Sequence, residues 1–327
     1  MIPLILSEHV GAMVKLNKTS WVLFFSFFIY LFFTDNEQDI NLLNIPSLLQ
    51  IMLKFGFDCT ILEEGSFIYF GARKLLINIL NRNGGEKMRF KVTYEAEWIP
   101  VHYRMKIYSL LKEAIKKADI SFYQQLFEQQ RQEIKPFSTA VYLRDFRIEG
   151  QRIYLKDFSI TVSSTMEFAI HAFNGFREME EYMIGGVKWK QSSIQLLREA
   201  EIASHSVILK TLSPILVEDQ NGKPLSPTDE GYEKELNYFA NLQIRQAAGR
   251  ELYRPIRFTP INMQKMVVKE SNRIYQETHP DQSLYYTAYK GLIKLEGHWE
   301  DLQILYQLGI GKRTAFFGLT DYIREEG

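Results

Sequence analysis

A glycine-rich stretch with two adjacent cations lies near the C-terminus and could bind a phosphate. It runs from Leu308 and contains Gly309, Gly311, Lys312, Arg313 and Gly318. Glycines let backbone N–H groups approach phosphate oxygens closely, and the two cations supply positive charge. The stretch is not a P-loop, because that motif requires glycine where Tyr306 stands and serine or threonine at position 313. A plain tight turn between a helix and an edge strand explains the glycines equally well.

Strands and helices alternate in the body of the chain and must position this loop. In the first part, strands are expected over 89–95, 136–143, 152–163 and 193–202, and helices over 103–117 and 166–176. Alternating apolar residues predict the strands, a period near 3.6 predicts the helices, and Glu149-Gly150 predicts a hairpin turn. The order β-α-β-β-α-β is that of a ferredoxin-like unit.

The second part repeats this order less clearly. Strands are expected over 205–217, 256–268, 283–295 and 314–323, and helices over 228–248 and 300–308. Thr228 and the acidic residues after it suit a helix start. We therefore predict an α+β protein of two tandem ferredoxin-like (RRM-like) domains, 88–203 and 204–327, the second of which carries the glycine-rich loop. A generic α+β chain without internal duplication is the alternative.

Charge and cysteine content restrict the possible functions. The 327 residues include 39 Lys and Arg against 39 Asp and Glu. The net charge of zero excludes a strong overall attraction to nucleic acid, so RNA binding must use local patches. Cys59 is the only cysteine, which excludes an internal disulfide framework and a cysteine-based zinc site. We expect a cytoplasmic protein without a metal or small-molecule cofactor.

The first 87 residues differ in character from the rest. The aromatic-apolar block Trp21–Phe33 has 13 residues, whereas a membrane-spanning helix needs roughly 20. Gly84-Gly-Glu before Met88 is compatible with codons that read as a ribosome-binding sequence. We therefore predict that Met88 is the true start and that 1–87 is an N-terminal extension mis-assigned from upstream sequence. We expect no contact with a membrane; a membrane anchor and an extra buried segment are the alternatives.

Three stretches of the body resemble landmarks of one family. They are Lys-Pro-Phe-Ser-Thr-Ala-Val-Tyr at 135–142, Lys-Thr-Leu-Ser-Pro-Ile-Leu-Val at 210–217, and the region 285–318 with its glycines. In order and spacing they resemble the CRISPR-associated repeat endoribonucleases, the sixth Cas protein family of the RAMP superfamily, over 88–327. The chain departs from the family pattern in having six residues between Gly311 and Gly318 instead of five, and Thr320 where glycine is usual.

The resemblance implies a function. Such proteins bind the repeat of a CRISPR precursor RNA and cut it once per repeat without a metal, through attack of a ribose 2′-OH on the adjacent phosphate. The expected partners are CRISPR repeat RNA and a CRISPR effector complex, and the expected state is a monomer or homodimer. The glycine-rich loop is then expected to contact RNA through Gly309, Gly311, Lys312, Arg313 and Gly318. A non-cleaving repeat-RNA-binding protein of the same fold is the alternative.

The catalytic residues of that family are only partly present. Lys135 stands at the position of the family's lysine, but Phe127 occupies the position of its histidine and Lys112 that of its helix tyrosine. Among the histidines of the body, His102 is the best substitute, since it follows the first strand and can face the cleft between the domains. We predict His102, Lys135 and, more weakly, Tyr103 as catalytic residues. A surface histidine at a helix start is the alternative for His102.

Overall fold

The computed structural model describes residues 87–270 and 283–323. These residues belong to one compact unit, Phe70–Gly327. The N-terminal extension predicted over 1–87, including the block Trp21–Phe33, lies outside the described residues apart from Lys87. Within the two described ranges, no helix has the length and apolar character needed to cross a membrane.

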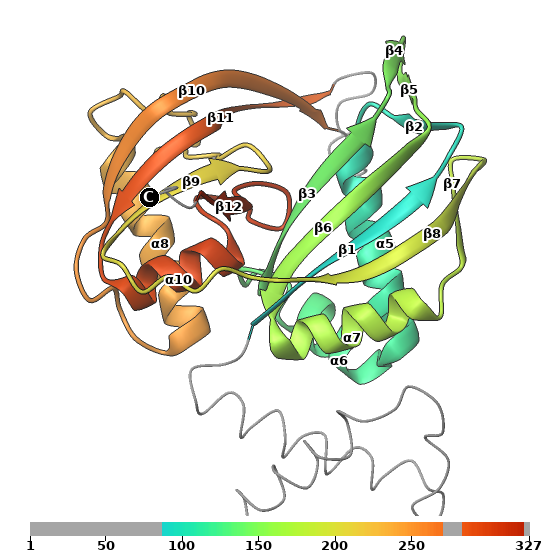
Figure 1. Cartoon of the computed structure of the whole chain (residues 1–327), viewed down its shortest axis with the longest axis horizontal. Helices are drawn as coiled ribbons and strands as arrows, with labels where there is room; N and C mark the ends of the chain where they lie inside the picture. Colours follow the sequence, from blue (N-terminus) through green and yellow to red (C-terminus); the bar gives the residue numbers. More distant parts are fainter. Residues whose placement is uncertain (1–86, 271–282, 324–327) are drawn as a thin grey trace, which may run out of the picture. The chain divides into compact units, whose positions relative to one another are not determined.

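The first domain is a five-stranded antiparallel sheet covered by helices (Figure 1). Its elements are β1 (Lys87–Glu95), α5 (Tyr103–Ala118), β3 (Phe137–Arg144), β6 (Asp157–Thr165), α7 (Met166–Arg177), β7 (Glu181–Ile184) and β8 (Val187–Leu197). The strand order is β3-β6-β1-β8-β7. Without the edge strand β7, this is the order of a ferredoxin-like unit, whose first and third strands lie at the centre.

The second domain repeats the arrangement. Its elements are β9 (Ser206–Thr211), α8 (Tyr232–Ala248), β10 (Arg257–Glu270), β11 (Leu284–Glu296), α10 (Trp299–Leu308) and β12 (Thr320–Tyr322). The strand order β10-β11-β9-β12 again places the first and third strands of the unit at the centre. The α+β class with two tandem ferredoxin-like domains is thereby confirmed.

Several elements differ from the sequence expectation. The strand expected over 152–163 is divided into β5 (Arg152–Tyr154) and β6, and β5 joins β2 (Trp98–Pro100) and β4 (Arg147–Glu149) in a separate three-stranded sheet. The strand expected over 193–202 begins earlier, because Val187 onward pairs with the unexpected strand β7. The strand expected over 314–323 begins only at Thr320, because the preceding residues form the glycine-rich loop. A short helix, α6 (Ile120–Gln124), and a π-helix, η1 (Gln125–Gln129), follow α5.

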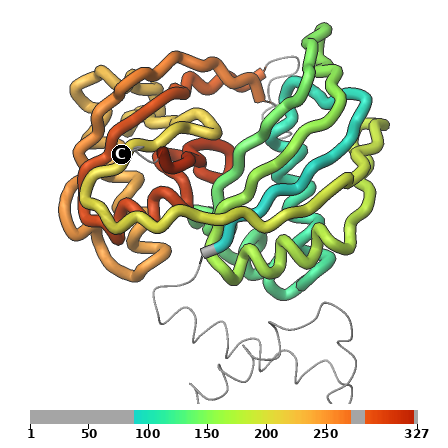
Figure 2. The backbone as a smooth tube through the Cα atoms, in the orientation of Figure 1, coloured from blue at the N-terminus to red at the C-terminus, as the bar shows by residue number. Residues whose placement is uncertain are grey.

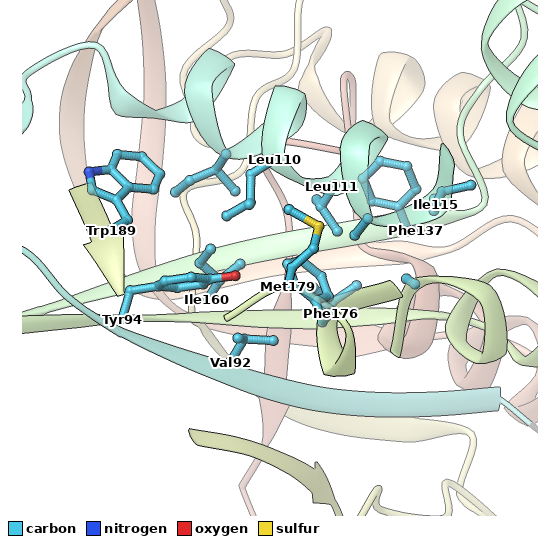
Figure 3. Packing of buried hydrophobic residues seen from close by; sticks show 14 of the residues in the cluster. Val92, Tyr94, Leu110, Leu111, Ile115, Phe137, Ile160, Phe176, Met179 and Trp189 are labelled. Carbon is cyan, nitrogen blue, oxygen red and sulfur yellow. The ribbon is translucent and has the colours of Figure 1, made fainter. Parts of the chain in front are cut away.

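The core of the first domain lies between its sheet and the helices α5 and α7. Side chains that alternate along the strands meet the apolar faces of the helices, as in the part drawn in Figure 3: Val92, Tyr94, Leu110, Leu111, Ile115, Phe137, Ile160, Phe176, Met179 and Trp189. The two helices approach closely at Gly175, where an added Cβ would lie 1.8 Å from the carbonyl oxygen of Ala114. Glycine is therefore required at this crossing.

The opposite face of the first sheet is joined to the second domain. Arg89 on β1 is 3% exposed, and its guanidinium lies 4.5 Å from the centroid of the Tyr306 ring on α10 and donates to the Tyr306 carbonyl at 3.2 Å. The second domain also reaches the helix-covered face at the edge strand β3, where Thr139, in register with the core residue Val162, donates to the carbonyl of Ala315 at 2.6 Å. At the other end of the interface, the end of β10 lies beside the start of α5 (Figure 2). The N-terminal end of α5 therefore faces the second domain.

Candidate functional site

A small cavity lies between the two domains. Its volume is about 60 Å³, and its wall carries two cationic side chains, Arg104 from α5 and Lys290 from β11. Tyr103, Thr139 and Ser213 also line it. Since a water molecule needs at least ~10–15 Å³ measured in this way, the cavity has room for a small polar group rather than an organic cofactor. Both domains thus contribute polar groups to one enclosed space.

His102 immediately precedes α5 and has two lysines beside it. Its side chain makes no capping hydrogen bond to the helix. Partial burial lowers the pKa of His102, and the positive charges of Lys106 and Lys269 lower it further. Lys269 belongs to β10 of the other domain and donates to the side-chain oxygen of Gln151 at 3.2 Å. The imidazole is therefore mainly neutral near pH 7 and can accept a proton beside two cations.

A buried carboxylate at the same end of α5 was not expected from the sequence. Glu270, the last residue of β10, is 6% exposed, and its carboxylate lies 3.5 Å from the guanidinium of Arg104. Burial raises the pKa of Glu270 to about 7, although Arg104 acts in the opposite direction. The alternation of β10 could have indicated that Glu270 is buried, because Glu270 lies two residues after the buried Val268 and therefore points to the same face of the strand. A carboxyl group that titrates near pH 7 is suited to proton transfer or to a pH-dependent contact.

Tyr103 is the second predicted catalytic residue at this end. Its side chain is buried, and burial raises the pKa of its hydroxyl, while the nearby Arg104 lowers it. The phenol therefore stays protonated at neutral pH and is a poor proton acceptor. Tyr103 also contributes to the cavity wall and to the hydrophobic core of the first domain. The position of Tyr103 therefore favours a role in packing and as a hydrogen-bond donor rather than as a general base.

Lys135 is engaged by the backbone. Its amine donates to the carbonyl oxygens of Leu126 at 2.9 Å, Gln130 at 2.6 Å and Arg131 at 3.4 Å, around the end of η1. Partial burial lowers the pKa of Lys135; Glu133 acts against this and Lys112 adds to it. All three hydrogen atoms of an ammonium group are thus directed at carbonyls. In this arrangement Lys135 caps a helix end.

Phe127, at the position of the family's histidine, is a core residue. It is 6% exposed, and its ring lies 5.7 Å from that of Tyr108 and 5.5 Å from that of Tyr123. Tyr108 in turn packs at 5.1 Å on Phe316 of the glycine-rich loop. The place where the resemblance puts the histidine is therefore filled by an aromatic cluster that connects α5 to the loop.

The glycines of the C-terminal loop permit close packing of its own backbone. Gly311 and Gly318 have φ values of +90° and +76°, and an added Cβ would lie 2.5 Å and 2.0 Å from the nearest carbonyl oxygens. The N–H groups of Ile310, Lys312 and Gly318 donate to carbonyls of the loop itself and of 214–216. These N–H groups are used within the domain, so RNA contact by this loop must depend mainly on its side chains.

The two loop cations differ in their surroundings. Lys312 donates to the carboxylate of Glu218 at 2.6 Å. Arg313 is exposed, has a φ of +58°, and holds its guanidinium 5.1 Å from the centroid of the Tyr286 ring. A non-glycine residue in this left-handed region is uncommon and strained. Arg313 is therefore the loop cation that is available to a phosphate.

The second domain matches a known protein family. Residues 197–321, which contain β9 to β12 and the glycine-rich loop, match the family described as CRISPR associated protein Cas6, C-terminal. Residues 197–321 therefore resemble the C-terminal domain of Cas6 proteins. The resemblance to the CRISPR-associated repeat endoribonucleases is thereby confirmed. No curated protein matches the sequence.

Solved structures share the fold of the Cas6 family over the described body. A Cas6-related protein from Pyrococcus furiosus is 21% identical with a TM-score of 0.61, and the alignment covers 74% of this chain and 100% of that one. A RAMP protein described as binding different RNA substrates is 19% identical, with a TM-score of 0.59 and coverage of 72% and 100%. A CRISPR associated protein Cas6 is 18% identical, with a TM-score of 0.57 and coverage of 73% and 100%. At identities of 18–21%, these TM-scores show that the fold is shared and nothing more.

Within this Cas6 fold, the predicted catalytic residues lie at opposite ends of α5. His102 precedes the helix and neighbours Lys106, whereas Lys135 and Phe127 neighbour Lys112. Ten residues of helix separate positions 102 and 112, which corresponds to about 15 Å. His102 and Lys135 therefore do not form one catalytic pair, and each remains a separate prediction. The structure instead places Lys106 and Lys269 near His102, and it pairs Arg104, two residues further along the chain, with Glu270.

Proposed function

We propose that this protein binds CRISPR repeat RNA at the contact between its two domains and cuts it there. One observation carries the proposal. At the start of α5, His102 lies near Lys106 and Lys269, whose charges together with partial burial lower its pKa, and next to the contact that Arg104 makes with the second domain. The related RAMP protein described as binding RNA substrates supports a nucleic-acid ligand for this fold.

The groups at this end suit cleavage of RNA by its own ribose. His102 takes the proton of a 2′-OH, whose oxygen attacks the adjacent phosphorus and forms a 2′,3′-cyclic phosphate. The bond to the 5′-oxygen breaks, and this oxygen leaves as a 5′-OH after it receives a proton from the protonated imidazole or from water. Lys269 and Lys106 stabilise the extra negative charge of the phosphorane. The released guide RNA then passes to a CRISPR effector complex.

A non-cleaving repeat-RNA-binding protein is the second candidate. It is favoured by Phe127, which fills the family's histidine position with a core side chain, and by Lys135, whose amine is occupied by three carbonyls. In that case the same contact between the domains holds RNA without cutting it. The loop cation Arg313 would contribute to binding in both cases.

The two candidates are separated by incubating the protein with the repeat RNA of its own CRISPR array in excess EDTA. Cleavage once per repeat, with 2′,3′-cyclic phosphate and 5′-OH ends identified by mass spectrometry, is the result we expect. Tight binding with intact RNA after prolonged incubation would establish the non-cleaving candidate. Cleavage that requires an added divalent ion would contradict the proposed chemistry.

A further inference from the structure

The small sheet formed by β2, β5 and β4 carries two aromatic rings and an arginine on one of its faces. In its register, Trp98 pairs with Tyr154, and Tyr154 pairs with Arg147, so these three side chains lie on the same face. On the other face, Ile99 and Ile153 are 0% and 3% exposed, whereas Ile148, which pairs with Ile153 on the edge strand, is 60% exposed. The face with Trp98, Tyr154 and Arg147 is partly open to solvent: Arg147 is exposed and Tyr154 is half-buried, while the half-buried Trp98 also packs against the core of the first domain.

Arginine side chains cover both aromatic rings of this face. The guanidinium of Arg152 lies 4.3 Å from the centroid of the Trp98 ring, and that of Arg147 lies 5.2 Å from the centroid of the Tyr154 ring. Arg147 also pairs with Glu149 at 2.8 Å. Arg152 is exposed and has no ion pair with any residue in the described ranges. It therefore presents a flat cation, already held against an indole, to the solvent.

We propose that this face, defined as Trp98, Arg152, Tyr154 and Arg147, is a stacking platform for unpaired nucleotides of the bound RNA. A planar guanidinium packed on an aromatic ring leaves its outer plane free to stack on a base, and its charge attracts the neighbouring phosphate. Such stacking tolerates any base, because every base has a π-face. The inference rests on the proposed function and adds a second contact region to it.

The platform adjoins the candidate site at His102. Only Val101 separates Pro100, the last residue of β2, from His102, and the N–H of Val101 donates to the carbonyl of Gln151 at 3.0 Å. The side chain of Gln151, directly before Arg152, accepts from Lys269 at 3.2 Å. Lys269 is one of the two cations that lower the pKa of His102. If one phosphate of an RNA strand lies at His102, the nucleotides next to that phosphate can therefore reach the platform.

The test measures RNA affinity of the full chain with two probes. One probe is a fluorescein-labelled single-stranded oligouridylate, and the other is a blunt RNA hairpin that has no unpaired flank. The variants Arg152→Gln and Trp98→Ala are expected to bind the oligouridylate roughly 5- to 150-fold more weakly, the range for loss of one base–aromatic stack. Their affinity for the hairpin is expected to stay within about twofold of the parent.

The second domain offers a matched control. Tyr253 is 55% exposed and also has an arginine, Arg250, stacked on it at 3.8 Å, and it lies on the segment between α8 and β10. Tyr253→Ala is expected to leave both affinities unchanged. Arg152 is exposed, so Arg152→Gln keeps the test valid even if Trp98→Ala lowers the thermal unfolding temperature. Trp98→Phe, which retains an aromatic face, is expected to restore most of the oligouridylate affinity.

The outcomes separate the platform from the proposed function. If Arg152→Gln and Trp98→Ala bind the oligouridylate as tightly as the parent does, the platform is refuted while RNA binding at His102 stands. If the parent binds neither the oligouridylate nor the hairpin, both proposals fail together. A loss of affinity for both probes in Arg152→Gln would also contradict the platform, because it would show a general phosphate contact instead of stacking.

Discussion

Each end of α5 has a predicted catalytic side chain beside it, His102 at the start and Lys135 toward the C-terminal half, and the two side chains have different surroundings. At the C-terminal half, Lys135 gives its amine to three backbone carbonyls, and Phe127 is enclosed by aromatic rings. At the N-terminal end, His102 makes no hydrogen bond to the helix and lies beside lysines from both domains. A residue at a family motif position, such as Lys135, can thus have a structural role. A residue outside the motif, such as His102, can have a side chain that is free to take part in chemistry. The following predictions test this difference.

The largest expected effect belongs to the N-terminal end. His102→Ala is expected to slow single-turnover cleavage of repeat RNA by about 10²–10⁴-fold, the usual contribution of a general acid or base, with little change in affinity. The matched control is His205→Ala, since His205 is an exposed histidine of the second domain. A cleavage rate within a few-fold of the parent in His102→Ala would remove His102 from the mechanism.

A pH-dependent stability is expected from Glu270 at the same end. Because burial raises the pKa of Glu270 from 4.5 to about 7, the folded chain keeps a proton that the unfolded chain releases. The parent should therefore lose stability relative to Glu270→Gln as the pH rises from about 4.5 to 7, by about 3 kcal/mol in total at 1.36 kcal/mol per pKa unit. Urea unfolding at several pH values measures this difference, and Glu97→Gln, at an exposed carboxylate, is the control. Parallel stability curves for the parent and Glu270→Gln would show that the pKa of Glu270 is the same in the folded and the unfolded chain.

A structural effect is expected at the other end of α5. Lys135→Met removes the donor from three carbonyls and should lower the free energy of unfolding by about 1–3 kcal/mol, the range for hydrogen bonds made by a charged group. Cleavage at a temperature where the variant stays folded should fall less than about tenfold, since a structural cap does not take part in proton transfer. Lys116→Met, at an exposed lysine of the same helix, is the control. Collapse of cleavage with unchanged stability in Lys135→Met would reverse the comparison between the two ends.

The smallest expected effect concerns the glycine-rich loop. Arg313→Ala should reduce the slope of log affinity against log salt by about 0.7, the contribution of one phosphate contact on a single strand. Lys312→Ala should change the slope less, because Lys312 is already paired with Glu218. Titration of repeat RNA at several salt concentrations measures both slopes, with Arg198→Ala as a control at another exposed arginine. Equal slopes for the parent and Arg313→Ala would favour a purely structural turn.

The sequence predicted the fold better than the site. Apolar periodicity located α5 and α7 within one or two residues, because their faces pack on a single sheet. The small strands β2 and β4 were missed, and β5 was joined to β6, because three-residue strands are too short to show alternation. The role of Lys135 depends on carbonyls that η1 brings together, and the role of Glu270 depends on a contact between domains. Neither arrangement can be derived from local sequence.

The pH dependence of cleavage tests the central claim most directly. The account places the base at His102, whose pKa is lowered below 6.5 by burial and by Lys106 and Lys269. In single-turnover cleavage of repeat RNA in EDTA, the rate should therefore reach half its maximum below pH 6.5 and be constant from pH 7 to 8. A rate that still rises above pH 8, as a lysine or tyrosine base would produce, or the absence of cleavage at every pH, would contradict it.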